Sequence, residues 1–200
     1  MASNDHATKA LDRVKVTMTS GVAERAIGRH SAGAPPTDPD PMPGPWRWRL
    51  RRLALMLVIL AVCLNTAPGL IVPDTKLDLT ENPWGFLGRA LHLWDRLGFA
   101  GQLQNQAYGY FFPMGPFFGA FHSLGLPAWV TERLWWTVVL CVAFGGMTLL
   151  IERLRVADGL AATLGGLAYA GSAHLLTVIG PVSSEIWPMA VAPLVLVPLV

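Results

Sequence analysis

The sequence predicts an all-α membrane protein built from several spanning helices. Of its 200 residues, 52% are hydrophobic and only 14% are charged, whereas about 25% of the residues of a soluble domain are charged. From about residue 52 onward, long apolar runs alternate with short polar stretches, as expected for helices that cross a hydrocarbon layer about 30 Å thick. The formal net charge is only +2, so nucleic acid is not an expected partner.

The N-terminal residues 1–46 predict a flexible tail. They are polar and end in AGAPPTDPDPMPGP, whose prolines disfavour helix and whose apolar content is too low to offset the entropy of ordering. The basic stretch WRWRLRR then precedes an apolar run at about residues 52–72. Because arginine-rich flanks stay in the cytoplasm, this run predicts a first span with a cytoplasmic N-terminus and an outer C-terminal end.

Three further apolar runs predict spans at about residues 129–151, 159–179 and 187–200, the last of them truncated by the end of the sequence. The first of these three ends in Arg153 and Arg155, which the charge bias places in the cytoplasm. Residues 73–128 are therefore expected to form one outer loop. Residues 47–200 are expected to be the N-terminal part of a longer multi-span domain.

The outer loop is predicted to contain a surface helix and an apolar segment that does not cross. Asn82 and Pro83 are typical of a helix start, and the apolar spacing after them predicts an amphipathic helix to about Leu97. Prolines and glycines interrupt the apolar segment 108–126, which favours a re-entrant or interfacial element. In the third predicted span, small residues every four positions favour close helix packing, at Ala162, Gly166 and Ala170.

Acidic residues directly after the first span are the strongest functional signal. Asp74 and Asp78 follow the span within a few residues, and Glu81 precedes the surface helix. A carboxylate at the membrane surface can reach a lipid headgroup and a water-borne acceptor together, and there it could take a proton from an attacking hydroxyl. Alternatively, these acids are solvated loop residues near the positive end of a helix, an interpretation that fits Glu81 best.

Basic residues beside these acids are candidates for holding a phosphate, namely Lys76, Arg89 and Arg133, with His92 as an accessory donor. Headgroup contact or helix anchoring would explain each of them alone. Glu185 is the acid of the second outer loop, and a second carboxylate in the same cavity could hold a divalent cation. No motif requires a cofactor, and the ligands of such a cation are unknown.

The order of these elements resembles that of the polyprenyl-phosphate-dependent glycosyltransferases of the GT-C fold. More closely, DTKLDLTENPWGFLGRALHLWD, QAYGYFFPMGPFF and ERLWW, in that order, resemble the start of the actinobacterial α-(1→3)-arabinofuranosyltransferase D family. The resemblance covers about residues 52–200 and leaves out the polar tail. It implies a GT-C-type multi-span bundle, with amphipathic surface helices in the first outer loop, that continues far beyond Val200.

The resemblance also implies a function. Arabinofuranose would pass from a decaprenyl-phosphoryl-arabinofuranose donor to an arabinan acceptor of arabinogalactan or lipoarabinomannan, at the outer face of the plasma membrane. The catalytic acid of GT-C enzymes lies in the first outer loop, which maps onto Asp74 or Asp78, with Asp74 preferred. The transfer is expected to invert the anomeric centre, and a 200-residue piece is expected to be inactive on its own.

Two other classes of protein stay open from the residues alone. A transporter or flippase subunit for lipid-linked sugars also combines broken apolar segments with glycine-rich spans. Such a protein would be expected to carry ionisable residues near the middle of its spans, whereas here only His174 lies inside one. An assembly module without activity is the other alternative.

Overall fold

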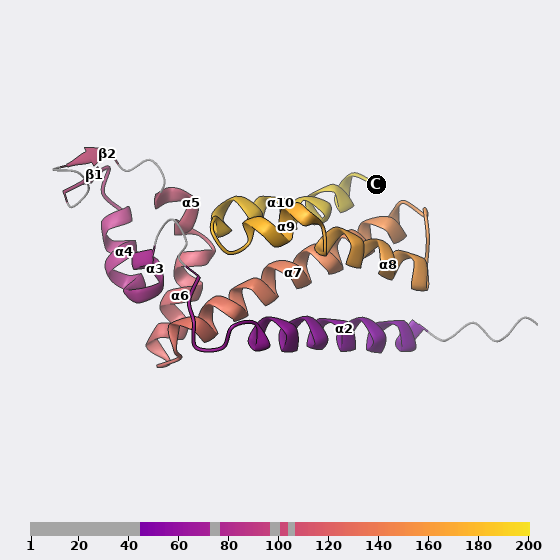
Figure 1. The fold of residues 1–200 in the computed structure, drawn as a ribbon. Helices are drawn as coiled ribbons and strands as arrows, with labels where there is room; N and C mark the ends of the chain where they lie inside the picture. Colours follow the sequence, from indigo (N-terminus) through magenta and orange to yellow (C-terminus); the bar gives the residue numbers. More distant parts are fainter. Residues whose placement is uncertain (1–44, 73–76, 97–100, 104–106) are drawn as a thin grey trace, which may run out of the picture. The chain divides into compact units, whose positions relative to one another are not determined.

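The computed structural model describes residues 45–72, 77–96, 101–103 and 107–200, which all belong to one unit, Gly44–Val200 (Figure 1). The tail predicted for residues 1–46 lies outside the described residues, apart from its last two. The elements follow in the order α2 (Pro45–Asn65), α3 (Leu77–Glu81), α4 (Pro83–Ala90), β1 (Trp94–Asp95), β2 (Gln102–Leu103), α5 (Ala107–Phe111), α6 (Met114–Ser123), α7 (Ala128–Arg153), α8 (Gly159–Ala170), α9 (Ala173–Val178), α10 (Ser183–Leu196) and the 3₁₀ turn Val197–Leu199.

Helix α7 is the element against which the other long helices pack. Its 26 residues give a length of about 39 Å at 1.5 Å per residue. Among the described residues, it is the one helix that is both long and apolar enough to cross a membrane. Helices α2, α8 and α10 all contact it (Figure 1). Its bounds agree closely with the second span predicted at residues 129–151.

Helix α2 ends earlier than the sequence predicts. The predicted first span runs to residue 72, but the helix stops at Asn65. Pro68 lacks an amide N–H and disfavours helical geometry in the residue before it, and that residue, Ala67, has a φ of 44°. Residues 66–72 therefore form an irregular segment that leads from the helix into the predicted outer loop.

The predicted third span, residues 159–179, is divided into two helices. Gly171 and Ser172 separate α8 from α9, and Ser172 has an extended conformation with a ψ of 144°. The 12 residues of α8 are about 18 Å long, less than the thickness of a hydrocarbon layer. The close packing predicted from small residues is confirmed, because a Cβ atom on Gly166 would lie 2.6 Å from the carbonyl oxygen of Phe144 on α7.

Helix α4 begins where predicted but is shorter. The Asn82 side-chain oxygen accepts a hydrogen bond from the Gly85 N–H at 3.0 Å, which confirms the predicted cap. The helix ends at Ala90 instead of continuing to about Leu97. Leu91, the next residue of the apolar face, is 69% exposed, so its side chain adds little packing that would hold a further turn of the helix.

A small sheet and two short helices also lie between α2 and α7 in the sequence. Strand β1 pairs with β2 in antiparallel register, with Trp94 opposite Leu103. Each strand has only two residues, so the described part of the chain is mostly helical, in agreement with the predicted all-α class. The predicted apolar element at 108–126 consists of α5 and α6, which are 5 and 10 residues long. Neither helix is long enough to cross a hydrocarbon layer about 30 Å thick.

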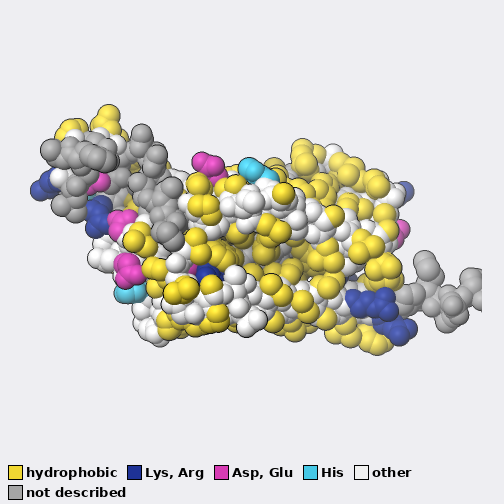
Figure 2. Space-filling view, in the orientation of Figure 1, with side chains coloured by type: hydrophobic (Ala, Val, Ile, Leu, Met, Phe, Trp, Pro, Cys, Tyr) yellow, Lys and Arg dark blue, Asp and Glu magenta, His cyan; other side chains and the backbone are white. Residues whose placement is uncertain are grey.

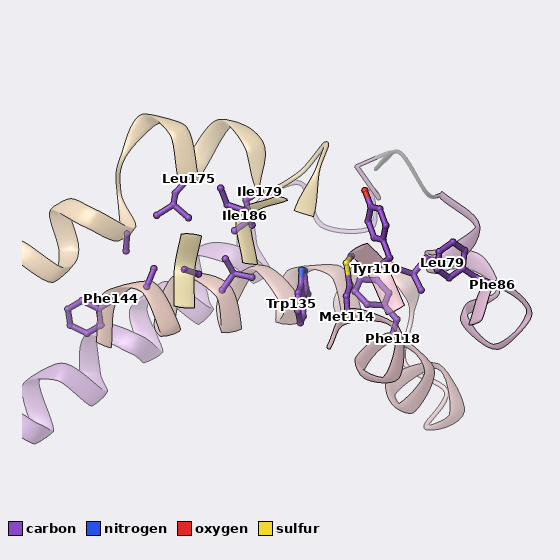
Figure 3. Close-up of a cluster of buried hydrophobic side chains, with 14 of the residues drawn as sticks. Leu79, Phe86, Tyr110, Met114, Phe118, Trp135, Phe144, Leu175, Ile179 and Ile186 are labelled. Atoms are coloured by element: carbon purple, nitrogen blue, oxygen red, sulfur yellow. The ribbon is translucent and has the colours of Figure 1, made fainter. Parts of the chain in front are cut away.

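Buried hydrophobic side chains join α3, α4, α5 and α6 to α7 (Figure 3). Trp135, in the second turn of α7, is 1% exposed. Its ring centroid lies 6.5 Å from that of Phe118 on α6 and 5.3 Å from that of Trp187 on α10. The same core includes Leu79 of α3 and Phe86 of α4. The first turns of α7 therefore fix the positions of α3, α4 and α6.

Candidate functional site

The second turn of α7 carries a buried ion pair that holds the segment following α2. The Arg133 side chain is fully buried, at 0% exposure, and its Nη1 donates to Glu132 Oε2 at 2.8 Å. Its Nε donates to the carbonyl oxygen of Thr66 at 3.0 Å, and its Nη2 donates to that of Leu70 at 3.0 Å. All three nitrogen atoms of the guanidinium are thus used inside the protein.

Glu132 completes this arrangement from the same turn. Its carboxylate oxygens accept from the Val72 N–H at 3.2 Å and 3.1 Å. The Arg133 guanidinium also lies over the ring of Trp136, 4.0 Å from its centroid, a geometry that attracts a cation to an aromatic face. Glu132 and Arg133, called the buried pair below, therefore bind the backbone of residues 66–72 at three positions.

The buried pair anchors one side of the acid-bearing segment. Val72 is the last residue before positions 73–76, and the predicted site residues Asp74 and Lys76 lie outside the described residues. On the other side of these positions, α3 is anchored by Leu79, which is 1% exposed, and contacts both α6 and α7. The backbone that enters residues 73–76 and the helix that follows them are therefore both fixed by packing against α7.

Two of the predicted site residues pair with each other. Asp78, in the first turn of α3, forms an ion pair with Arg89 in the last turn of α4. The Asp78 side chain is 47% exposed, so it remains accessible to an acceptor from the water. The sequence predicts separate roles for these residues, as a base and as a phosphate ligand, but the structure places them in direct contact.

Arg89 also lines a pocket of about 560 Å³ at the end of α4. Among the described residues, its lining also includes His92, Leu93, Trp94, Asp95 and Arg96. Two guanidinium groups and an imidazole in one pocket can bind a phosphate, and a carboxylate can accept hydrogen bonds from sugar hydroxyls. No site prediction from the sequence includes Asp95, although it closes the quoted string ending in LHLWD.

The remaining predicted site residues are placed differently. Glu81 is exposed at the end of α3, and Glu185 is exposed in the first turn of α10. Arg133 has protein partners on all its nitrogen atoms, so a role in binding the donor phosphate stays a prediction that this geometry does not favour. Across the described part of the chain, no group of three or more His, Cys, Asp or Glu side chains is arranged to hold a metal ion.

Comparison with known proteins covers the same region. A family model described as "Alpha-(1->3)-arabinofuranosyltransferase, N-terminal GT-C domain" matches residues 58–200. The chain belongs to this arabinofuranosyltransferase family. The matched residues include the buried pair, the Asp78–Arg89 pair and the pocket at the end of α4.

Two curated relatives carry the name of this arabinofuranosyltransferase family. The one from Mycobacterium tuberculosis is 50% identical over 141 residues, and the one from Mycolicibacterium smegmatis is 48% identical over 141 residues. Both matches cover 70% of this chain and 10% of the relative. The chain thus spans about a tenth of the length of the arabinofuranosyltransferases that it matches.

A solved structure of the arabinofuranosyltransferase AftD from mycobacteria has a similar fold. The cryo-EM structure superposes with a TM-score of 0.71 at 45% sequence identity, over 76% of this chain and 12% of that chain. A second cryo-EM structure, of a mutant of the same arabinofuranosyltransferase, gives a TM-score of 0.70 at the same identity and coverage. The arrangement of helices in this chain is therefore that of the corresponding part of AftD.

Proposed function

We propose that this chain is the N-terminal part of a membrane glycosyltransferase that transfers arabinofuranose from a decaprenyl-phosphate carrier to cell-wall arabinan. The family and the names of the relatives support arabinofuranose as the transferred sugar. The acceptor would be an arabinan chain of arabinogalactan or lipoarabinomannan. The observation that supports this function best in the structure is the buried pair, which fixes the backbone leading to the acids of the outer loop.

In this mechanism, Asp74 is the base and Asp78 is the second candidate. The carboxylate takes the proton from an acceptor hydroxyl, whose oxygen attacks the anomeric carbon of arabinofuranose. The bond from that carbon to the carrier phosphate breaks, and the configuration at the carbon inverts. This parallels the base of an inverting glycosidase, with a sugar hydroxyl in place of water. A phosphate leaving group needs little help from an acid.

Cations near the acids would stabilise the negative charge on the departing carrier phosphate. Arg89 is held beside Asp78 and faces the pocket that also contains His92 and Arg96. Lys76 lies outside the described residues and stays a candidate for the same task. A divalent cation held by Asp74 and a second carboxylate such as Glu185 stays a further candidate.

The buried pair would act through the backbone and not through the substrate. Arg133 and Glu132 are buried and bind the segment that ends at Val72, two positions before Asp74. Displacement of a reacting group by about 1 Å can cost about 100-fold in rate. Arg133 and Glu132 are therefore positioning residues in this proposal.

The same proposal places the chain in the plasma membrane with its outer loop outside. Arg52 at the start of α2 forms an ion pair with Glu152 at the end of α7, so these two helices run antiparallel. Their arginine-rich ends consequently lie on one side, and the positive-inside tendency assigns that side to the cytoplasm. Residues 66–128 then face outward, where a lipid carrier and a wall polymer would meet.

A transporter or flippase subunit for lipid-linked sugars is the second candidate. The break between α8 and α9, and the internal Pro188 and Pro193 of α10, are features that discontinuous transporter helices share. Net movement of a lipid-linked sugar across vesicles, without transfer to an acceptor, would favour this candidate.

The test is transfer from a prenyl-phosphate-linked arabinose donor by the full-length protein in membranes. Asp74→Asn is expected to lower turnover by at least about 100-fold, the lower range of general-base effects. Asp78→Asn should have a smaller effect, and Glu81→Gln is the matched control because Glu81 is an exposed acid of the same loop. Unchanged turnover in a variant that lacks both Asp74 and Asp78 would remove the proposed base.

A further inference from the structure

A groove between α2 and α8 lies apart from the candidate site. Its volume is about 390 Å³, and its walls are formed by Trp48, Arg51, Ala54, Leu55, Val58, Leu160 and Thr163. Val58 and Leu160 are more than half exposed, so the groove opens on the outer surface of the two helices. Within the described part of the chain, the groove is therefore open on the side formed by α2 and α8.

The groove is distant from the outer loop. Its mouth lies near Arg52 and Glu152, at the end of α7 opposite to the buried pair. Glu132 and Glu152 are twenty residues apart on α7, which corresponds to about 30 Å along the helix. An occupant of this groove is consequently a different molecule from a substrate at the candidate site.

The mouth of the groove carries a positive charge held in a defined place. The Arg51 guanidinium lies over the Trp48 ring, 4.8 Å from its centroid. That ring packs against Gly159, where a Cβ atom would lie 3.0 Å from Trp48, and Gly159 has a φ of +57° that a side chain would strain. The tryptophan thus connects Arg51 to the start of α8.

Positive charge is in excess around the N-terminal half of α2. Arg52 is paired with Glu152 and also donates to Thr163 Oγ1 at 3.4 Å, whereas the described residues give Arg51 no ion pair. The neighbouring arginines outnumber the acids, and Figure 2 shows Lys and Arg side chains gathered beside an apolar surface at the start of α2. A ligand with an anionic head and an apolar tail matches this combination of charge and apolar walls.

We propose that the groove between α2 and α8 binds one acyl chain of an anionic phospholipid whose phosphate contacts Arg51. The proposal rests on the membrane placement given under the proposed function. The tail lies against Ala54, Leu55, Val58 and Leu160, and the phosphate lies at the headgroup level beside Trp48. A basic pocket between membrane helices on the cytoplasmic side is the environment that binds anionic headgroups.

The experiment counts phospholipids that stay bound to the full-length protein after purification in mild detergent, by mass spectrometry of the extracted lipid. Wild type is expected to retain phosphatidylglycerol or another anionic phospholipid. Arg51→Gln should lower the retained amount about fivefold, the effect of one cation near a headgroup. Ala54→Phe, which fills the exposed groove, should lower it at least as much.

Arg49→Gln is the matched control, since Arg49 is an exposed arginine of the same helix that does not line the groove. It should retain the wild-type amount. Equal loss in Arg49→Gln and Arg51→Gln would overturn the proposal in favour of general attraction to the basic surface. The proposal would also be overturned if all variants retained equal amounts of lipid. The same holds if the protein retained only phosphatidylcholine from mixed vesicles, or if a partner protein occupied the groove in place of lipid. The amount of bound lipid is measured without any assay of sugar transfer. A protein that fails to transfer sugar would therefore contradict the proposed function and leave the lipid-binding proposal unaffected.

Discussion

The two ends of α7 carry ion pairs of the same chemical type in different surroundings. At the N-terminal end of α7, Arg133 and Glu132 are 0% and 6% exposed and bind backbone groups of residues 66–72. At the other end, Arg52 and Glu152 are 22% and 27% exposed and connect two helices side by side. The difference shows that burial, and not the presence of a salt bridge, decides which pair fixes the course of the chain.

The largest expected effect is the removal of Arg133. Arg133→Leu leaves the Glu132 carboxylate buried without its cation and three carbonyl or carboxylate groups without their donor. Breaking a buried pair in this way should cost about 3–5 kcal/mol of folding free energy. The loss is measured as a fall in the midpoint temperature of thermal unfolding. The full-length protein is heated in detergent, and the fraction that remains folded is determined by size-exclusion chromatography. A midpoint close to that of wild type would show that the outer segment does not depend on the pair.

The next effect is expected at the contact between α7 and α8. Gly166→Ala would place a methyl group against Thr148 Oγ1 and within 2.6 Å of the Phe144 carbonyl oxygen. Overpacking of this kind should cost about 1–3 kcal/mol. Gly88→Ala is the matched control, because no atom lies within 4 Å of the added methyl group in α4. If both variants had the same midpoint, the close helix approach would be contradicted.

A smaller effect is expected from the partly exposed pair at the other end of α7. Arg52→Gln removes the ion pair with Glu152 and the hydrogen bond to Thr163. Because solvent screens both charges, the expected loss is about 1 kcal/mol. The same thermal measurement checks it, with Arg49→Gln as the control for loss of charge. A loss as large as that of Arg133→Leu would contradict the comparison between the two ends.

The smallest effect on stability is expected at the exposed pair of the outer loop. Arg89→Gln removes the partner of Asp78, whose side chain is 47% exposed. Because solvent screens this pair, the free energy of unfolding should fall by no more than about 0.5 kcal/mol. Sugar transfer should nevertheless fall, because the pocket loses a cation for the carrier phosphate. Transfer equal to that of wild type would remove Arg89 from the proposed site.

Much of the helical arrangement follows from local sequence. The apolar run at 129–151 predicts α7 to within two residues at each end, and the Asn82 cap is recognisable because its chemistry involves neighbouring residues. The break at Gly171 and Ser172 was not predicted, since two small residues do not interrupt an apolar pattern. Its position depends on how α8 and α9 pack, which is not a local property.

The candidate site could be predicted only in part. The acids and arginines of the outer loop are visible as charges beside a span, and the pairing of Asp78 with Arg89 agrees with their closeness in the chain. The partners of Arg133 are backbone carbonyls 67 and 63 residues away, and no residue type in the sequence marks a carbonyl as a partner. For that reason, the sequence favours a phosphate ligand where the structure shows a backbone anchor.

The most direct test of the positioning role is the steady-state kinetics of arabinose transfer by full-length Arg133→Lys, normalised to the folded protein. Lysine keeps the charge but cannot donate from three fixed nitrogen atoms to Thr66, Leu70 and Glu132. We predict that kcat falls at least about tenfold while KM for the prenyl-linked donor stays within about twofold. A raised KM with unchanged kcat would contradict this, because it would show that Arg133 binds the donor phosphate directly.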